Sequence, residues 1–307
     1  MIEQPLLLGW LLVSHLTADF VLQTDTLVVD RRSPRGRRVV GALAVHGAIV
    51  AVCMVPFIAA FGLPGLAATV LVAVSHPLVD MGKARLDAPA ARSDASPAGW
   101  TPRPAALFLL DQAIHLAVLY AAWWLWLREA GVLGGFADLV GQATAGMASA
   151  DVHRAAVLVI LGWTLLVVNV RAAMFLVELL LPHKRPAQRL GRGASPAGAG
   201  AGPAESYSIR VGPISARVER EGPDIPVPEP RDSVGATIGV LERLLVVTLM
   251  ISGATLAIGL VVAAKTLARF KQLDERDFAE SYLLGTLASV AIAVASAAAA
   301  LAVLPAM

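Results

Sequence analysis

Seven stretches of the chain are apolar for long enough to cross a bilayer as helices, and polar segments separate them. A helix that crosses the hydrocarbon core needs about 20 mostly apolar residues. By that measure the pattern predicts spans at residues 5–23, 39–61, 63–81, 105–127, 155–181, 235–264 and 281–304. Hydrophobic residues make up 57% of the 307 and charged residues 16%, whereas a soluble domain is about a quarter charged. The expected fold is an all-α, polytopic helical membrane protein with six or seven transmembrane spans.

The apolar region 235–264 has two interpretations, because Gly253 interrupts it near its middle. Two short helices, about 236–251 and 255–271, would form a re-entrant hairpin. A single long helix would instead cross the membrane with a tilt or a kink at Gly253. Re-entrant backbone is tolerated only where other parts of the protein surround it. The sequence leaves both alternatives open.

The distribution of Lys and Arg predicts how the chain is oriented. The loops 24–38, 82–104 and 182–234 are rich in these residues, whereas the turn at 61–64 has none and 129–154 has only Arg154. Basic loops stay in the cytoplasm, so we expect these three there and the N-terminus outside. The N-terminal segment has neither the basic region nor the small-residue cleavage site of a signal peptide, and is expected to be a retained span.

The composition divides the chain into four expected regions. These are a four-helix core at 1–128, an extracytoplasmic loop and fifth span at 129–181, a disordered cytoplasmic linker at 182–234, and a C-terminal membrane module at 235–307. The linker is rich in Gly, Pro and Ala and has too few apolar residues to bury a core. Within it, the alternation in SYSIRVGPISARV predicts a small β-hairpin.

Ionisable residues recur inside four of the predicted spans, where an unpaired polar group costs several kcal/mol. Three His/Asp pairs are spaced i,i+4, which puts both side chains on one helix face. The pairs are His15 with Asp19, His76 with Asp80, and Asp111 with His115, and His46 stands alone on another span. At 1.5 Å rise per residue, all seven lie within about 15 Å of the predicted cytoplasmic side. This common depth predicts one shared site.

Imidazole and carboxylate groups together suit a divalent metal ion such as Zn, Mn, Fe or Mg. A single pair would more simply be an interhelical hydrogen bond, but three pairs and a further His favour a metal or proton site. The expected metal ligands are His15, Asp19, His76, Asp80 and His115. The expected catalytic bases are His46 and Asp111. Five polar residues are expected to support the site, and of these Glu242 and Arg243 either close it or pair with neighbours: Gln23, Lys83, Gln112, Glu242 and Arg243.

These motifs also carry a family resemblance. The series HLTADFVLQ at 15–23, HPLVDMGKARL at 76–86 and DQAIH at 111–115 is followed by LER, AAKTLARF and ESYLLGTL between 241 and 287. Together they resemble the bacterial membrane family catalogued as domain of unknown function 3307, over about 1–128 and 235–290. A weaker similarity is to bacterial membrane-bound metal-dependent hydrolases. The resemblance implies a metal site and supplies no established activity.

The leading functional hypothesis is a divalent-metal-dependent hydrolase of the bacterial inner membrane, acting on a lipid or lipid-linked substrate at the cytoplasmic leaflet. The alternative is a divalent-cation or proton transporter or channel that uses the same His/Asp residues. A haem-binding electron carrier fits less well, because the His residues have Asp partners. Cys53 is the only cysteine, so the chain has no internal disulfide or thiolate metal cluster. Membrane lipids are the expected partners, and the loop charges give no support for nucleic-acid binding.

Overall fold

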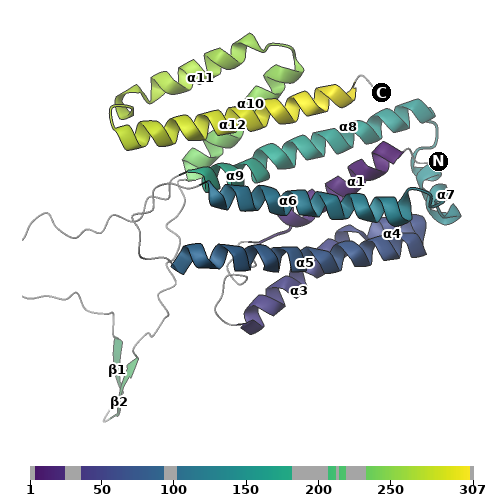
Figure 1. Ribbon diagram of the computed structural model, residues 1–307, viewed down its shortest axis with the longest axis horizontal. Coiled ribbons are helices and arrows are strands. Elements are labelled where there is room, and N and C mark those ends of the chain that lie inside the picture. The colour runs from purple at the N-terminus through teal and green to yellow at the C-terminus, as the bar shows by residue number, and fades with distance from the viewer. Residues whose placement is uncertain are drawn as a thin grey trace, which may run out of the picture. The chain divides into compact units, whose positions relative to one another are not determined.

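The computed structural model describes residues 4–24, 36–92, 102–181, 207–211, 214–218 and 233–304. The chain separates into two units, one made of Met1–Pro182 with Thr237–Met307 and the other of His183–Ala236. The first unit is a bundle of helices, as predicted (Figure 1). Most of the expected linker and the loop residues 25–35 and 93–101 lie outside the described residues, so the predictions made there are not tested.

The four-helix core follows the predicted pattern closely. Its elements are α1 (Gln4–Leu16) with the π-helix η1 (Thr17–Val21), α3 (Gly36–Cys53) with α4 (Val55–Phe61), α5 (Leu63–Arg92), and α6 (Arg103–Ala122) with the π-helix η2 (Trp123–Leu127). The axis bends by 41° between α3 and α4. Gly62 has a φ of +62°, which a residue with a Cβ rarely adopts, and it allows the tight turn into α5 that FGLP predicts.

The rest of the helical unit contains three further parts. A short helix, α7 (Gly134–Ala143), precedes a long one made of α8 (Ser149–Val167), the π-helix η3 (Val168–Ala172) and α9 (Ala173–Leu180). The C-terminal part contains α10 (Ser233–Ile251), α11 (Leu256–Ala268), the 3₁₀ turn η4 (Phe270–Gln272) and α12 (Arg276–Val303). Two expectations were wrong in detail, since α5 continues to Arg92 instead of ending near residue 81, and α7 was not predicted.

Four helical segments are long and apolar enough to span a bilayer: Leu63–Leu86, Arg103–Leu127, Ser149–Leu180 and Arg276–Val303. The bent pair α3–α4 would be a fifth span. Only 28% of an apolar 18-residue window in each of the four segments is buried inside the protein, so most residues of these windows are partly or fully exposed. Such a surface suits hydrocarbon and not water. The described residues therefore form a multi-pass helical membrane protein, although the predicted count of six or seven spans is not confirmed.

The region around Gly253 is a hairpin and not one long helix. The helices α10 and α11 are separated by Ser252–Thr255, where Gly253 has a φ of +76°. Lys265 on α11 forms an ion pair with Glu242 on α10, which requires the chain to double back between them. The interpretation of this region as a single long helix across Gly253 is therefore wrong.

The core helices divide into an apolar half and a polar half. The apolar half is a buried cluster that includes Leu7 and Leu11 of α1, Val50 of α3, Phe57 of α4 and Leu119 of α6. The polar residues occupy the other end of the same helices, because α1 and α5 run in one direction while α3 and α6 run in the other. This antiparallel arrangement brings segments far apart in sequence to one level of the bundle.

The second unit contains a two-stranded antiparallel sheet. Strands β1 (Tyr207–Val211) and β2 (Ile214–Val218) pair in a register that runs from Tyr207 opposite Val218 to Val211 opposite Ile214. The predicted hairpin is therefore confirmed.

Candidate metal centre

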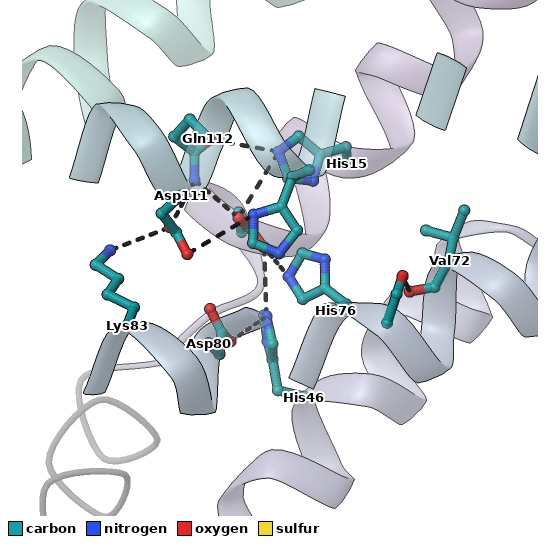
Figure 2. A network of polar contacts seen from close by, with 11 residues as sticks. His15, His46, Val72, His76, Asp80, Lys83, Asp111 and Gln112 are labelled. Atoms are coloured by element: carbon teal, nitrogen blue, oxygen red, sulfur yellow. Dashed lines mark hydrogen bonds and ion pairs between the residues drawn. The ribbon is translucent and has the colours of Figure 1, made fainter. Parts of the chain in front are cut away.

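All seven His and Asp residues that the sequence singles out meet in the polar half of the core (Figure 2). The four imidazole rings form a compact group, since neighbouring ring centroids are 4.0 to 5.6 Å apart. His46 is fully buried, and Asp80 is the most exposed of the seven at 10% of its side chain. We call this group the His/Asp centre: His15, Asp19, His46, His76, Asp80, Asp111 and His115.

The carboxylate of Asp19 connects three of the histidines. Its Oδ1 lies 2.7 Å from Nε2 of His76 and 3.3 Å from Nε2 of His46. Its Oδ2 lies 3.8 Å from Nε2 of His15, the i,i+4 partner predicted from the sequence. His46 also approaches Asp80, with 3.7 Å between Nε2 and Oδ2. The lone histidine of the second predicted span therefore belongs to the same centre as the pairs.

A second carboxylate, that of Asp111, forms the edge of the centre. Lys83 donates a hydrogen bond from Nζ to Oδ2 of Asp111 at 3.1 Å, and Gln112 donates to the same oxygen at 3.3 Å. Gln112 also donates to Oδ2 of Asp19 at 3.4 Å, while its Oε1 lies 3.3 Å from Nε2 of His15. Gln112 thus bridges the carboxylates of two helices. Both Lys83 and Gln112 were expected to support the site, but the Lys83–Asp111 ion pair itself was not predicted.

The π-helix η1 places Asp19 relative to His15. Its wider turn interrupts the usual i→i−4 hydrogen bonds just after the α1 histidine, and such insertions are frequent at functional sites. Arg171, in the π-helix η3, donates a hydrogen bond from Nε to the backbone oxygen of Phe20 at 3.0 Å. Two irregular segments therefore brace each other beside the centre. The sequence signal for this contact is the position of a charged residue, Arg171, inside the predicted apolar span 155–181.

In each of three sets of side chains, the ligand atoms lie within 4.8 Å of one another. They are His15, Asp19 and His76; His46, His76 and Asp80; and Asp80, Asp111 and His115. The first and third sets share no residue, although their histidines His76 and His115 are in contact. The donors present therefore suit one ion, or two ions held side by side, with imidazole and carboxylate ligands of the kind that divalent transition metals prefer.

Several buried polar atoms of the centre support this assignment. Nδ1 of His46 and both ring nitrogens of His115 have no hydrogen-bond partner among the described residues. Buried polar atoms are almost always satisfied, so these nitrogens fit a role as ligands of an ion. With the histidines neutral, three carboxylates and one ammonium group leave two negative charges, which one divalent ion would neutralise.

Two of the five expected supporting residues, Glu242 and Arg243, make their described polar contacts with residues outside this centre. Gln23 is half-buried beyond the end of η1. Glu242 pairs with Lys265 on α11. The side chain of Arg243 on α10 is buried, and it donates hydrogen bonds to Oγ of Ser289 on α12 and to the backbone oxygen of Asn169 in η3. The alternative that Glu242 and Arg243 pair with neighbours agrees with these contacts.

The fold and the centre define a class of protein: a multi-pass helical membrane protein with a buried His/Asp cluster. In the comparison with known families, residues 7–132 match the family described as "Protein of unknown function (DUF3307)". The predicted family resemblance is therefore confirmed for the part of the chain that contains all seven residues. Neither a curated protein nor a solved structure matches the chain.

Proposed function

We propose that the His/Asp centre binds one or two divalent metal ions and that the protein is a metal-dependent hydrolase. The observation that carries this proposal is the meeting of four imidazoles and three carboxylates from distant parts of the sequence, which form three sets whose ligand atoms lie within 4.8 Å of one another. Simple bundle-stabilising hydrogen bonds account for one His/Asp pair. They do not account for seven ionisable groups gathered in one buried place.

A divalent ion held there would lower the pKa of a bound water toward neutrality and polarise the bond to be hydrolysed. His15, His76 and His115, with Asp19 and Asp80, are the proposed ligands. Gln112 orients Asp19 and His15 through its amide. His46, whose Nε2 lies between carboxylates of Asp19 and Asp80, is the proposed proton acceptor, and Asp111 holds Lys83 at the edge.

The exposure of Lys83 supports access from one side. Its side chain is 27% exposed, whereas no His or Asp side chain of the centre exceeds 10%. A half-exposed ammonium beside buried metal ligands is suited to hold a phosphate or another anionic group. Since the helices lie in a membrane, we propose a lipid or a lipid-linked phosphoester as substrate. The cytoplasmic leaflet of a bacterial inner membrane is its proposed location, on the basis of the loop charges.

The alternative function is transport of divalent cations or protons through the same residues. A conducting path needs polar groups across the whole membrane. The other half of the core is instead packed with Leu7, Leu11, Val50, Phe57 and Leu119. This apolar half favours a sealed catalytic site.

Reconstituted protein distinguishes the two functions. Wild-type protein in detergent should hydrolyse a membrane phosphoester from a panel of phospholipids and isoprenoid phosphates, and His115→Gln should abolish that turnover. The same protein in liposomes should show no metal or proton flux. Flux through the wild type that His115→Gln removes would contradict the hydrolase and favour the transporter.

The proposed orientation is tested separately by cysteine labelling on a Cys53→Ser background. Ser33→Cys lies in the arginine-rich loop and should react only from the cytoplasmic side. Ala145→Cys follows α7 and should react only from the opposite side. The reverse labelling pattern would place the open edge of the His/Asp centre in the other leaflet.

A further inference from the structure

A second polar site lies in the C-terminal part, away from the His/Asp centre. Its pocket is lined by residues of three helices, α10, α11 and α12. Its enclosed space is small, about 10 Å³, and the pocket opens to the outside of the helices. We call it the hairpin pocket, and its lining residues are Glu242, Arg243, Val246, Val261, Val262, Lys265, Thr286, Ser289 and Val290.

The guanidinium of Arg243 is the unusual feature of the hairpin pocket. Arg243 is only 4% exposed. Nε donates to the backbone oxygen of Asn169 at 2.6 Å and Nη1 donates to Oγ of Ser289 at 3.3 Å. Nη2 is buried and has no hydrogen-bond partner among the described residues. Buried cations are normally paired with a carboxylate or with another anion.

The carboxylate nearest in sequence does not fill this role. Glu242 is adjacent to Arg243 on α10, so the two side chains leave the helix in different directions. Glu242 instead forms an ion pair with Lys265. The pocket therefore carries two cations and one carboxylate, which leaves one positive charge uncompensated among its lining residues. Hydroxyl groups of Thr286 and Ser289 add neutral hydrogen-bonding capacity beside that charge.

The side chains around the hairpin pocket indicate which class of anion would pair with Arg243. The remaining lining residues are four valines, so the pocket is polar around Arg243 and apolar elsewhere. Large apolar side chains of α10, α11 and α12 face outward around it, among them Leu241 at 61% exposure, Leu260 at 72% and Leu287 at 65%. An anion that reaches Arg243 through such a surface is most simply the head of a lipid.

We infer that the hairpin pocket binds the phosphate group of an anionic lipid, with Arg243 as the central ligand and Lys265, Thr286 and Ser289 beside it. A guanidinium recognises phosphate oxygens through two parallel N–H donors, and one of those donors is already free here. The inference is independent of the proposed hydrolase, since none of these residues belongs to the His/Asp centre.

The experiment measures the thermal unfolding midpoint and lipid retention, by native mass spectrometry, of full-length protein in detergent micelles. Three additions are compared: phosphatidylglycerol, phosphatidylcholine at the same mole fraction, and inorganic phosphate without lipid. Phosphatidylglycerol should stabilise the wild type and remain bound, and phosphatidylcholine should do so less, because its choline cancels the negative charge. Stabilisation by inorganic phosphate as strong as that by phosphatidylglycerol would overturn the lipid source while supporting phosphate recognition.

Variants test the role of each lining residue. Arg243→Gln should weaken phosphatidylglycerol binding by about tenfold or more. Thr286→Val, which leaves both hydrogen bonds of Arg243 in place, should weaken it by about threefold and covers the case in which Arg243→Gln does not fold. Glu242→Gln should strengthen binding, because it removes the only carboxylate of the pocket.

The matched control is Arg276→Gln, which removes an exposed guanidinium from the start of α12, outside the pocket. It should bind phosphatidylglycerol as the wild type does. Equal binding by the wild type, Arg243→Gln and Thr286→Val would overturn the inference, as would an absence of any effect of phosphatidylglycerol on the wild type.

Discussion

The two halves of the four-helix core are built from the same helices with opposite chemistry. One half buries side chains such as Leu11, Phe57 and Leu119 against one another, and its packing stabilises the bundle. The other half buries seven ionisable groups, which is costly in a dry interior unless they are paired or bind an ion. Packing of the apolar half gives a reason for the helices to associate, whereas burial of the polar half has a cost that the proposed metal ions would offset.

The largest expected effect is on activity, from a change in the polar half. Asp19→Asn removes the carboxylate that approaches three histidines, so turnover should fall by about a hundredfold or more. Zinc or manganese at a concentration of 100 Kd should raise the free energy of unfolding of the wild type by about 2.7 kcal/mol, and this gain should vanish in the variant. Unchanged turnover and unchanged stabilisation by metal in Asp19→Asn would contradict a role of Asp19 in metal binding.

The largest expected effect on stability comes from the apolar half. Phe57→Ala opens a cavity among buried side chains and should lower the free energy of unfolding by about 3–5 kcal/mol. The protein that remains folded should keep its full metal content. The control Val55→Ala changes an exposed residue of the same helix and should cost far less. Loss of metal in folded Phe57→Ala would show that the two halves are not separable.

A smaller effect is expected at the edge of the polar half. Lys83→Gln removes the ammonium that pairs with Asp111, and turnover of an anionic substrate should fall by about tenfold while the metal is retained. The KM should rise more than kcat falls, if Lys83 holds the substrate. Arg85→Gln removes an exposed cation from the same helix and serves as the control. Equal kinetics in the two variants would assign Lys83 a purely structural role.

The smallest effect is expected beside the centre. Arg171→Met removes the hydrogen bond to the backbone oxygen of Phe20 that braces η1, at a cost of about 1 kcal/mol in the free energy of unfolding. Metal affinity should fall slightly, because Asp19 lies in that π-helix. Arg154→Met, at an exposed position of α8, should leave both quantities unchanged. An unchanged metal affinity in Arg171→Met would show that η3 does not contribute to metal binding by the His/Asp centre.

Much of this arrangement could be predicted from periodicity. The i,i+4 spacing of His76 and Asp80 and their common depth with His15 were enough to predict that the groups meet. Lys83 follows Asp80 by three residues on the same face, so the spacing contained a signal for its place at the edge. Its pairing with Asp111 depends on the packing of α5 against α6, which one helix's pattern cannot specify.

Other features could not be predicted, for identifiable reasons. The π-helices arise where the hydrogen-bond pattern of the backbone adjusts to neighbouring helices, and no residue type marks them. The extension of α5 to Arg92 runs through a Pro- and Ala-containing stretch that resembles a loop in composition. Arg243 was expected either to close the His/Asp centre or to pair with neighbours, and the first of these interpretations rested on depth. Depth does not tell which helices face each other, and Arg243 lies in the hairpin pocket instead.

The most direct test of the central claim is elemental analysis of the purified protein. The wild type should contain about one or two divalent ions per chain. His76→Ala should lose most of them, because His76 contributes to two of the three possible ligand sets. His153→Ala, a change outside those sets on α8, should retain the wild-type content. Equal metal content in the wild type and His76→Ala would contradict the metal centre.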